Sequence, residues 1–293
     1  MAPPQTDLIR KIKDVVHHAR ALPAEAGTPF AHYRITGTDL WNSILYVERA
    51  FAQPDFYIAV ADHHLSRING MVLINLIENF ERFLKETAAT CVDCLANHVL
   101  DDRFNIFDIH GSNLASHFAT ATLGKSLCES GTWLNCEEIN KRFRKLLQEP
   151  FQDGKDQFNL FPKRNQQPVD QQWRFDVLAL IWQIRHSIVH NVGVITQSDA
   201  VKLRLLAREP VEAPTLLAPT RDDLRYVKSF LDETADSCNR RVGDRLAGLM
   251  TDLLNDTPGL FEARSEANRL TAAFGFVLSV GGIPGELPKD SAS

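Results

Sequence analysis

The strongest helical pattern in the first half of the chain is centred on Asn75-Leu-Ile-Glu-Asn-Phe-Glu-Arg-Phe-Leu-Lys85. It predicts a helix from about Ser66 to His98, with no Pro and no Gly after position 70. Apolar and small residues recur on one side of this helix at steps of three and four, namely Met71, Ile74, Ile77, Phe80, Leu84, Thr87 and Cys91. A helix of this length is expected to be the scaffold of the fold.

Helical patterns also dominate the rest of the chain, so we expect an all-α fold. A run of polar residues from Gln152 to Asp170 predicts a surface loop. The further predicted helices are Asp7 to Leu22, Asp39 to Ala52 after a capping Thr36-Gly-Thr38 turn, Cys136 to Leu147, Thr220 to Leu254 with Thr220 as the N-cap, and one beyond Pro258.

Composition limits the class of protein. The chain has 293 residues, 44% of them apolar, which is enough for a sizeable core. A net charge of −5 argues against a surface coated in positive charge for nucleic-acid binding. Three basic clusters could still line a local groove, although solvated faces are the more common reading: Lys141 to Lys145, Lys163-Arg164 and Arg240-Arg241.

No secretion signal or membrane-spanning segment is expected, so cytoplasmic residence is the default. Early charges such as Asp7 and Arg10 are followed by no apolar core. The longest weakly polar stretch, Leu270 to Gly285, is too short to span a bilayer.

Five cysteines at irregular spacing do not make a disulfide framework. Cys91 and Cys94 have the spacing used for zinc or redox chemistry, but they fall inside the long helical pattern. We therefore expect both to be small buried helix residues.

Polar side chains suited to catalysis are concentrated in one stretch, Trp182-Gln-Ile-Arg-His-Ser-Ile-Val-His-Asn-Val-Gly-Val-Ile-Thr196. Large apolar residues at helical spacing predict one buried face here. His186 and His190 should stack one turn apart, with Arg185 beside His186. Asn191 and Gly193 predict the end of the helix, and extended chain should follow. The buried face comprises Trp173, Val177, Ile181, Ile184 and Ile188.

A small β-hairpin is expected after this helix. Val201-Lys-Leu-Arg-Leu-Leu206 alternates enough to predict one strand, and Leu216-Leu217 its partner.

Arg185-His-Ser-Ile-Val-His190-Asn191 resembles the R-x4-H signature of the HEPN superfamily. The arginine is followed by a polar residue, His186, and aliphatic Ile188 and Val189 precede the histidine, as in that family. The resemblance implies a HEPN-like helical domain over residues 61–254. An N-terminal helical extension, 1–60, would precede it, and a C-terminal helix with a flexible tail, 255–293, would follow.

The resemblance also implies a function. Such proteins are metal-independent endoribonucleases that act as homodimers with a composite cleft, and they need no cofactor. Many are toxins or antiphage and stress effectors, which would give this chain RNA as substrate and an antitoxin or regulatory protein as partner. One subgroup carries a tyrosine two residues after the histidine, which a partner nucleotidyltransferase modifies, but this chain has Val192 there.

The chemistry of the residues fits RNA cleavage independently of the resemblance. Attack by the 2′-hydroxyl needs a group that moves a proton near neutral pH and a fixed cation for the phosphate. We assign the first role to His190 and the second to Arg185, with His186 orienting one of them. Asn191 would contact the substrate or cap the helix, and Ser187 would contact the substrate or face solvent.

Two other readings remain open. His186 and His190 could form an i, i+4 zinc pair, although Ser187 stands where a glutamate would be expected. A third ligand would then come from His110, His117 or the His63-His64 pair. Alternatively, the chain could be a non-catalytic module that binds RNA or nucleotide, or dimerises, through the same polar cluster.

Overall fold

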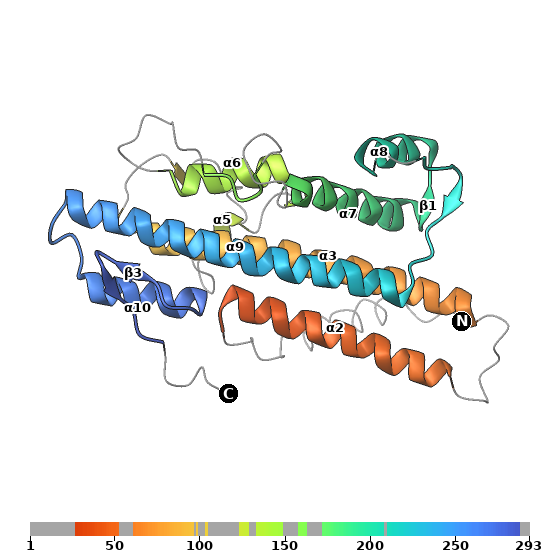
Figure 1. The fold of residues 1–293 in the computed structure, drawn as a ribbon, viewed down its shortest axis with the longest axis horizontal. Coiled ribbons are helices and arrows are strands. Elements are labelled where there is room, and N and C mark those ends of the chain that lie inside the picture. Colours follow the sequence, from red (N-terminus) through yellow and green to blue (C-terminus); the bar gives the residue numbers. More distant parts are fainter. Residues whose placement is uncertain are drawn as a thin grey trace, which may run out of the picture.

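The structure is a computed structural model that describes residues 27–52, 61–96, 98, 103–104, 123–128, 133–148, 158–162, 172–207 and 210–287. Over these residues it is mostly helical, with two short antiparallel strand pairs (Figure 1). The predicted all-α fold with a small β-excursion is therefore confirmed. The described elements are α2 (Pro29–Phe51), α3 (Ala61–Leu95), α5 (Leu123–Cys128), α6 (Cys136–Leu146), α7 (Gln172–Asn191), β1 (Val194–Ile195), α8 (Gln197–Ala207), β2 (Thr215–Leu216), α9 (Arg221–Asp256), α10 (Ala263–Phe274), β3 (Ser279–Val280) and β4 (Ile283–Pro284).

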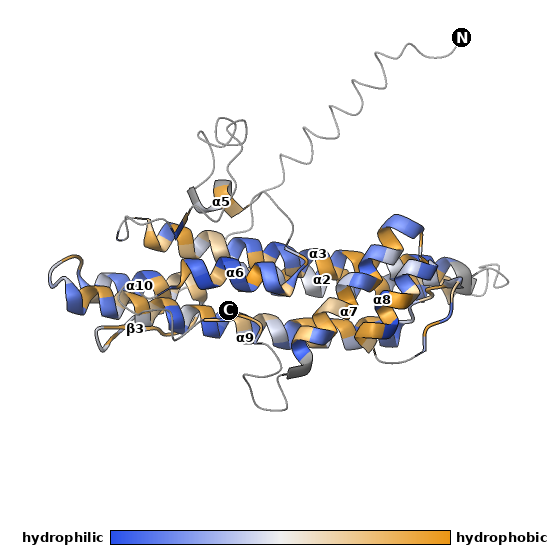
Figure 2. Ribbon diagram, turned by 90° about the horizontal axis from the view of Figure 1, so that it is seen from above, coloured by the Kyte–Doolittle hydropathy of each residue, from blue (hydrophilic) through white to orange (hydrophobic). Residues whose placement is uncertain are grey.

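The long helix α3 is the centre of the fold, as its sequence predicted. The equally long α9 runs beside it, α6 and α7 lie along one side of this pair, and α2 and α10 lie along the other (Figure 1). Ile77, Phe80 and Leu84 of the predicted face are fully buried. Phe83 is buried as well, so α3 is covered on more than one side. Most helices carry both polar and apolar residues, as amphipathic packing requires (Figure 2).

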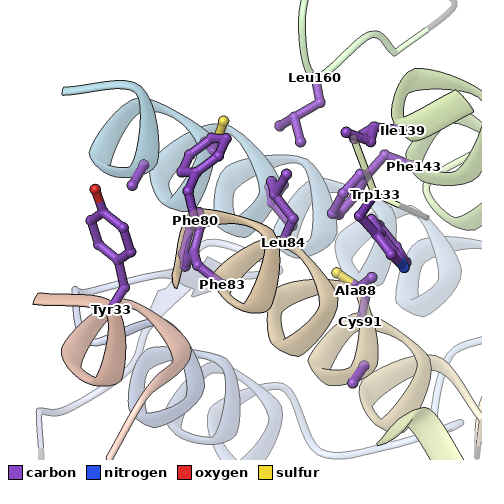
Figure 3. Close-up of a cluster of buried hydrophobic side chains, with 14 of the residues drawn as sticks. Tyr33, Phe80, Phe83, Leu84, Ala88, Cys91, Trp133, Ile139, Phe143 and Leu160 are labelled. Carbon is purple, nitrogen blue, oxygen red and sulfur yellow. The ribbon is translucent and has the colours of Figure 1, made fainter. Parts of the chain in front are cut away.

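An aromatic cluster joins α2 to α3 (Figure 3). The ring of Tyr33 lies 5.5 Å from that of Phe83 and 6.3 Å from that of Phe80, between centroids. The Tyr33 hydroxyl donates a hydrogen bond of 2.9 Å to Asp232 on α9. Burial, together with the charge of Asp232, raises the pKa of Tyr33, so the phenol remains a donor. One side chain thus connects three helices.

The other half of the core forms where α5 and α6 meet α3. Trp133 is fully buried against Phe143, and its indole N–H donates to the carbonyl of Cys128 at 3.1 Å (Figure 3). Gly124 on α5 permits a close approach, because a Cβ there would lie 2.1 Å from the carbonyl oxygen of Ala89. Asn140 makes a reciprocal pair of hydrogen bonds with the backbone of Phe161.

The predicted start of the second N-terminal helix is wrong. α2 begins at Pro29, well before Asp39, and it includes the residues expected to form a Thr36-Gly-Thr38 turn. The Thr28 side chain caps the helix by accepting from the N–H of Ala31, and Pro29 suits the first helical position. Packing of Tyr33 against α3 and α9 keeps this segment helical although Gly37 lowers its helix propensity.

The predicted strand at Val201 to Leu206 is also wrong, because this segment belongs to α8. Ala200 and Leu203 are buried one turn apart, whereas Leu205 is 74% exposed, which is a helical pattern of burial. The expected partner strand does exist. β2 pairs with β1 in the register Val194 to Leu216, so the hairpin partner lies directly after α7. The β3–β4 pair was not predicted.

The remaining helix predictions are confirmed within the described residues. α6, α9 and α10 lie where sequence patterns placed them. Thr220 and Asp223 form a capping box at the start of α9. The predicted helix Asp7 to Leu22 and most of the loop Gln152 to Asp170 lie outside the described residues. None of the described helices is both long and apolar enough to cross a membrane.

Replacing Gly37 by Ala tests the position of Gly37 inside α2. A Cβ there would meet Asn79 at 3.7 Å and Lys228 at 3.9 Å, which are ordinary contacts. We expect Gly37→Ala to raise the free energy of unfolding by about 0.5–1 kcal/mol in urea denaturation, because alanine favours a helix. Gly275→Ala is the control and should lower it, because Gly275 has φ +77°. A loss of stability in Gly37→Ala would favour a turn at this position.

Candidate functional site

Helix α7 has one face in the core and one on the surface. Leu178 and Ile181 are buried against the rest of the fold. His186 and His190 are exposed on the other face, where the sequence pattern placed them. The helix ends at Asn191, as predicted, and β1 follows.

A polar pocket of about 570 Å³ lies over this exposed face. It brings together Arg185, His186 and His190 from α7 and Lys202 from α8. The other walls come from α7 and from the start of α6, and they include Phe175, Trp182, Asn135 and Glu137. All three predicted catalytic residues therefore share one pocket, and two aromatic side chains of α7 also line it.

Arg185 is held in place by the central helix. Its Nη2 lies 3.0 Å from Oε1 of Glu78 on α3, and its side chain is mostly buried. Its Nε is buried and has no hydrogen-bond partner among the residues that the structure describes. An unmatched buried donor of this kind costs free energy in the folded protein.

His186 and His190 lie one turn apart, and their ring centroids are 4.6 Å from each other, with the planes tilted by 46°. The predicted stacking of these two side chains is confirmed. At this distance the two rings pack against each other, so each restricts the position of the other.

Asp199 organises the polar residues beside the pocket. Its carboxylate accepts hydrogen bonds from Gln183 at 2.9 Å, Asn191 at 2.7 Å and the Thr196 hydroxyl at 2.9 Å. Burial alone would raise the pKa of Asp199, but hydrogen bonds from Thr196 and Asn191 and the charge of His186 outweigh it and lower this pKa. Asp199 therefore joins the end of α7 to the start of α8.

The two predicted substrate contacts, Asn191 and Ser187, differ in how accessible they are to a substrate. One N–H of the Asn191 amide donates to Asp199, so its second N–H and its amide oxygen are left for a substrate. Ser187 is 0% exposed and donates to the carbonyl of Gln183 at 3.2 Å. Because Ser187 faces the interior, neither the predicted substrate contact nor the solvent-facing alternative fits its position.

The chain is strained directly after α7. Val192 has φ +53°, a left-handed conformation that β-branched residues rarely adopt, and its side chain is 79% exposed. Gly193 follows at φ +84°, where glycine is unstrained. The strain is located two residues after His190.

Sequence reasoning missed three residues of this region: Glu78, Asp199 and Lys202. Glu78 lies inside the quoted helical run, and nothing in that run marks it as the partner of Arg185. Asp199 and Lys202 lie one turn apart on α8, so reading 197–207 as a helix would have placed them together.

The structure offers no third ligand for a zinc pair among the described residues, where no group of three His, Cys, Asp or Glu side chains is suited to a metal. His110 and His117 lie outside those residues, as does the side chain of His63. All five cysteines are free and buried. Burial raises the pKa of Cys91 well above its usual range and that of Cys94 to about 11, as expected for structural thiols.

The basic clusters mostly support local structure. Arg142 lies 4.6 Å from the ring centroid of Trp133, and Arg241 donates to the carbonyl of Asn159 at 2.8 Å. Arg240 pairs with Asp236 at 3.1 Å. Lys163 and Arg164 lie outside the described residues. Lys202, which belongs to none of these clusters, is the additional cation at the pocket.

No family model, curated protein or solved structure matches this chain.

Asp199→Asn tests the link between α7 and α8. Because the pKa of Asp199 is lowered in the folded state, its ionised carboxylate stabilises the fold at every pH above the unfolded-state pKa of about 4. This contribution is lost as the pH falls through the lower pKa of the folded state. We expect the variant to lose about 1–3 kcal/mol of unfolding free energy at neutral pH. The difference from wild type should shrink in urea titrations at progressively lower pH. A pH-independent difference would contradict an ionised Asp199.

Proposed function

We propose that this chain is a metal-independent endoribonuclease that cleaves RNA through attack by the 2′-hydroxyl. The observation that supports it is the convergence of Arg185, His186, His190 and Lys202 on one pocket of about 570 Å³. This set supplies imidazoles for proton transfer and two cations for a phosphate, of which Arg185 is fixed by Glu78, with no need for a metal.

In this proposal, His190 moves the proton and Arg185 binds the phosphate. Glu78 restricts the guanidinium of Arg185 to one position, and Arg185 lines the pocket in which the phosphate would bind. His186, stacked on His190, orients that ring. Lys202 contributes a second positive charge from α8.

We further propose that two copies of the chain form the complete cleft. Val189 lies between the two histidines in sequence and is 41% exposed. Leu205 follows Lys202 by one turn on α8 and is exposed as well. A second copy would cover these apolar side chains, and it would bring a second set of imidazoles towards the same RNA.

A toxin or an antiphage or stress effector is the biological role we propose. Cleavage of cellular RNA stops translation, and such an activity must be held back until it is needed. An antitoxin or other regulatory protein is therefore part of the proposal.

A non-catalytic RNA-binding or dimerisation module is the second candidate function. It is favoured by one observation, which is that Arg185 and Asn191 already have protein partners in Glu78 and Asp199. Satisfied polar side chains can serve structure alone. The two candidates differ in whether RNA is cut.

The proposal predicts RNA cleavage in the presence of a chelator. Purified protein is incubated with mixed single-stranded RNA and EDTA, and the products are separated by electrophoresis. Arg185→Ala and His190→Ala should each lose about 10²-fold or more in rate, and His186→Ala should lose less.

Arg225→Ala is the matched control, since Arg225 is an exposed arginine on α9 outside the pocket. It should cleave like wild type, and circular dichroism should show that all variants fold. RNA that binds but stays intact at high protein concentration would select the non-catalytic module.

The dimer has its own test. Size-exclusion chromatography with light scattering should give twice the monomer mass for wild type and the monomer mass for Val189→Asp, because a buried aspartate would destabilise the interface. Tyr226→Asp alters an exposed apolar residue on α9 and should leave the mass unchanged. A monomeric wild type at micromolar concentration would refute the composite cleft.

A further inference from the structure

A second pocket lies apart from the proposed catalytic residues. It has a volume of about 300 Å³, which is at the lower end of the range for small-molecule sites. Its walls come from the first half of α3, from the end of α7 and from the segment that follows β2. We call it the α3–α7 groove.

Most of the groove surface is apolar. Ile74 on α3, Ile188 on α7 and Leu217 after β2 line it. Met71 also lines it and is 58% exposed. Apolar side chains left open around a concave site favour binding of an apolar group.

Gly70 lines the groove where α3 faces α7. A Cβ at Gly70 would lie 3.9 Å from Cγ2 of Ile188, so a larger side chain there would enter the space between the two helices. A methyl group would therefore fit at position 70, whereas a leucine side chain would occupy part of the groove.

One end of the groove is polar and positively charged. Ser66 and Arg67 line it at the beginning of α3. Neither has a hydrogen bond or ion pair within the described part of the chain, and no Asp or Glu lines the groove. Two donors among lining residues that include no carboxylate are complementary to a carboxylate.

The length of the groove indicates the size of the apolar part. From Arg67 to Ile74 the helix advances about 10 Å, at about 1.5 Å per residue. An extended alkyl chain of medium length, such as that of octanoate, spans this distance when its carboxylate lies at Arg67.

We propose that the α3–α7 groove binds a medium-chain fatty acid. Its carboxylate contacts Ser66 and Arg67, and its alkyl chain lies along α3 between Met71, Ile74 and Ile188. The proposal does not depend on ribonuclease activity, because none of these side chains belongs to the catalytic set.

Isothermal titration calorimetry with sodium octanoate tests the proposal. Wild type should bind one octanoate per chain, and butanoate, which is too short to fill the groove, should bind far more weakly. Arg67→Gln should weaken octanoate binding about tenfold. It should leave the binding of the neutral analogue octanol unchanged, because octanol has no charge for Arg67 to recognise.

Two further variants complete the test. Gly70→Leu should fold, since leucine favours a helix over glycine, and should lose octanoate binding because its side chain fills the groove. Arg225→Gln, which alters an exposed arginine elsewhere, should bind like wild type.

Three results would overturn the proposal. The first is the absence of any heat of binding at millimolar octanoate. The second is equal affinity of wild type for octanoate and octanol. The third is binding of octanoate by Gly70→Leu as tight as that by wild type. Light scattering could also show that wild type is a dimer and that Met71→Asp dissociates it. This result would assign the groove to a second copy of the chain and would also overturn the fatty-acid proposal.

Discussion

Burial of α3 on more than one side is the constraint on which the rest of the structure depends. A 35-residue helix with apolar residues around much of its circumference cannot be covered by one neighbour. α2, α7 and α9 all pack against it, and α5 approaches it closely at Gly124. Each fully buried ring, such as that of Phe80 or Phe83, contributes about 1.5–3 kcal/mol relative to an exposed one.

Hydrophobic burial brings these helices together, and buried hydrogen bonds set how they are aligned. Tyr33 donates to Asp232, Asn79 donates to the carbonyl of Tyr33, and Asn239 donates to the carbonyl of Phe274. Each bond joins different parts of the chain and would leave an unpaired buried group if a helix slid by one turn. The alignment of α2, α3, α9 and α10 is therefore tied to specific residues.

The packing of these helices sets the geometry of the polar pocket. α7 packs one face against the core and leaves His186 and His190 on the other. Glu78 reaches Arg185 from α3, so a residue of the central helix positions a residue of the pocket. Asp199 then ties the end of α7 to α8, which carries Lys202. Side chains from α3, α6, α7 and α8 form or position the pocket, although its key motif occupies one short segment.

The sequence by itself determined the long helices, the capping box at Thr220, the end of α7 at Asn191 and the stacking of His186 on His190, because helical period and capping are local properties. It misread Thr36-Gly-Thr38 as a turn and Val201 to Leu206 as a strand, since the local chemistry of these segments suits either conformation. Only the tertiary structure decided that α2 would continue through Gly37, that Ser187 would be buried, that Glu78 would pair with Arg185, and that Lys202 would line the same pocket as the histidines. The physical reason is that contacts between residues distant in the chain depend on which apolar faces are buried together, and no local period records that choice.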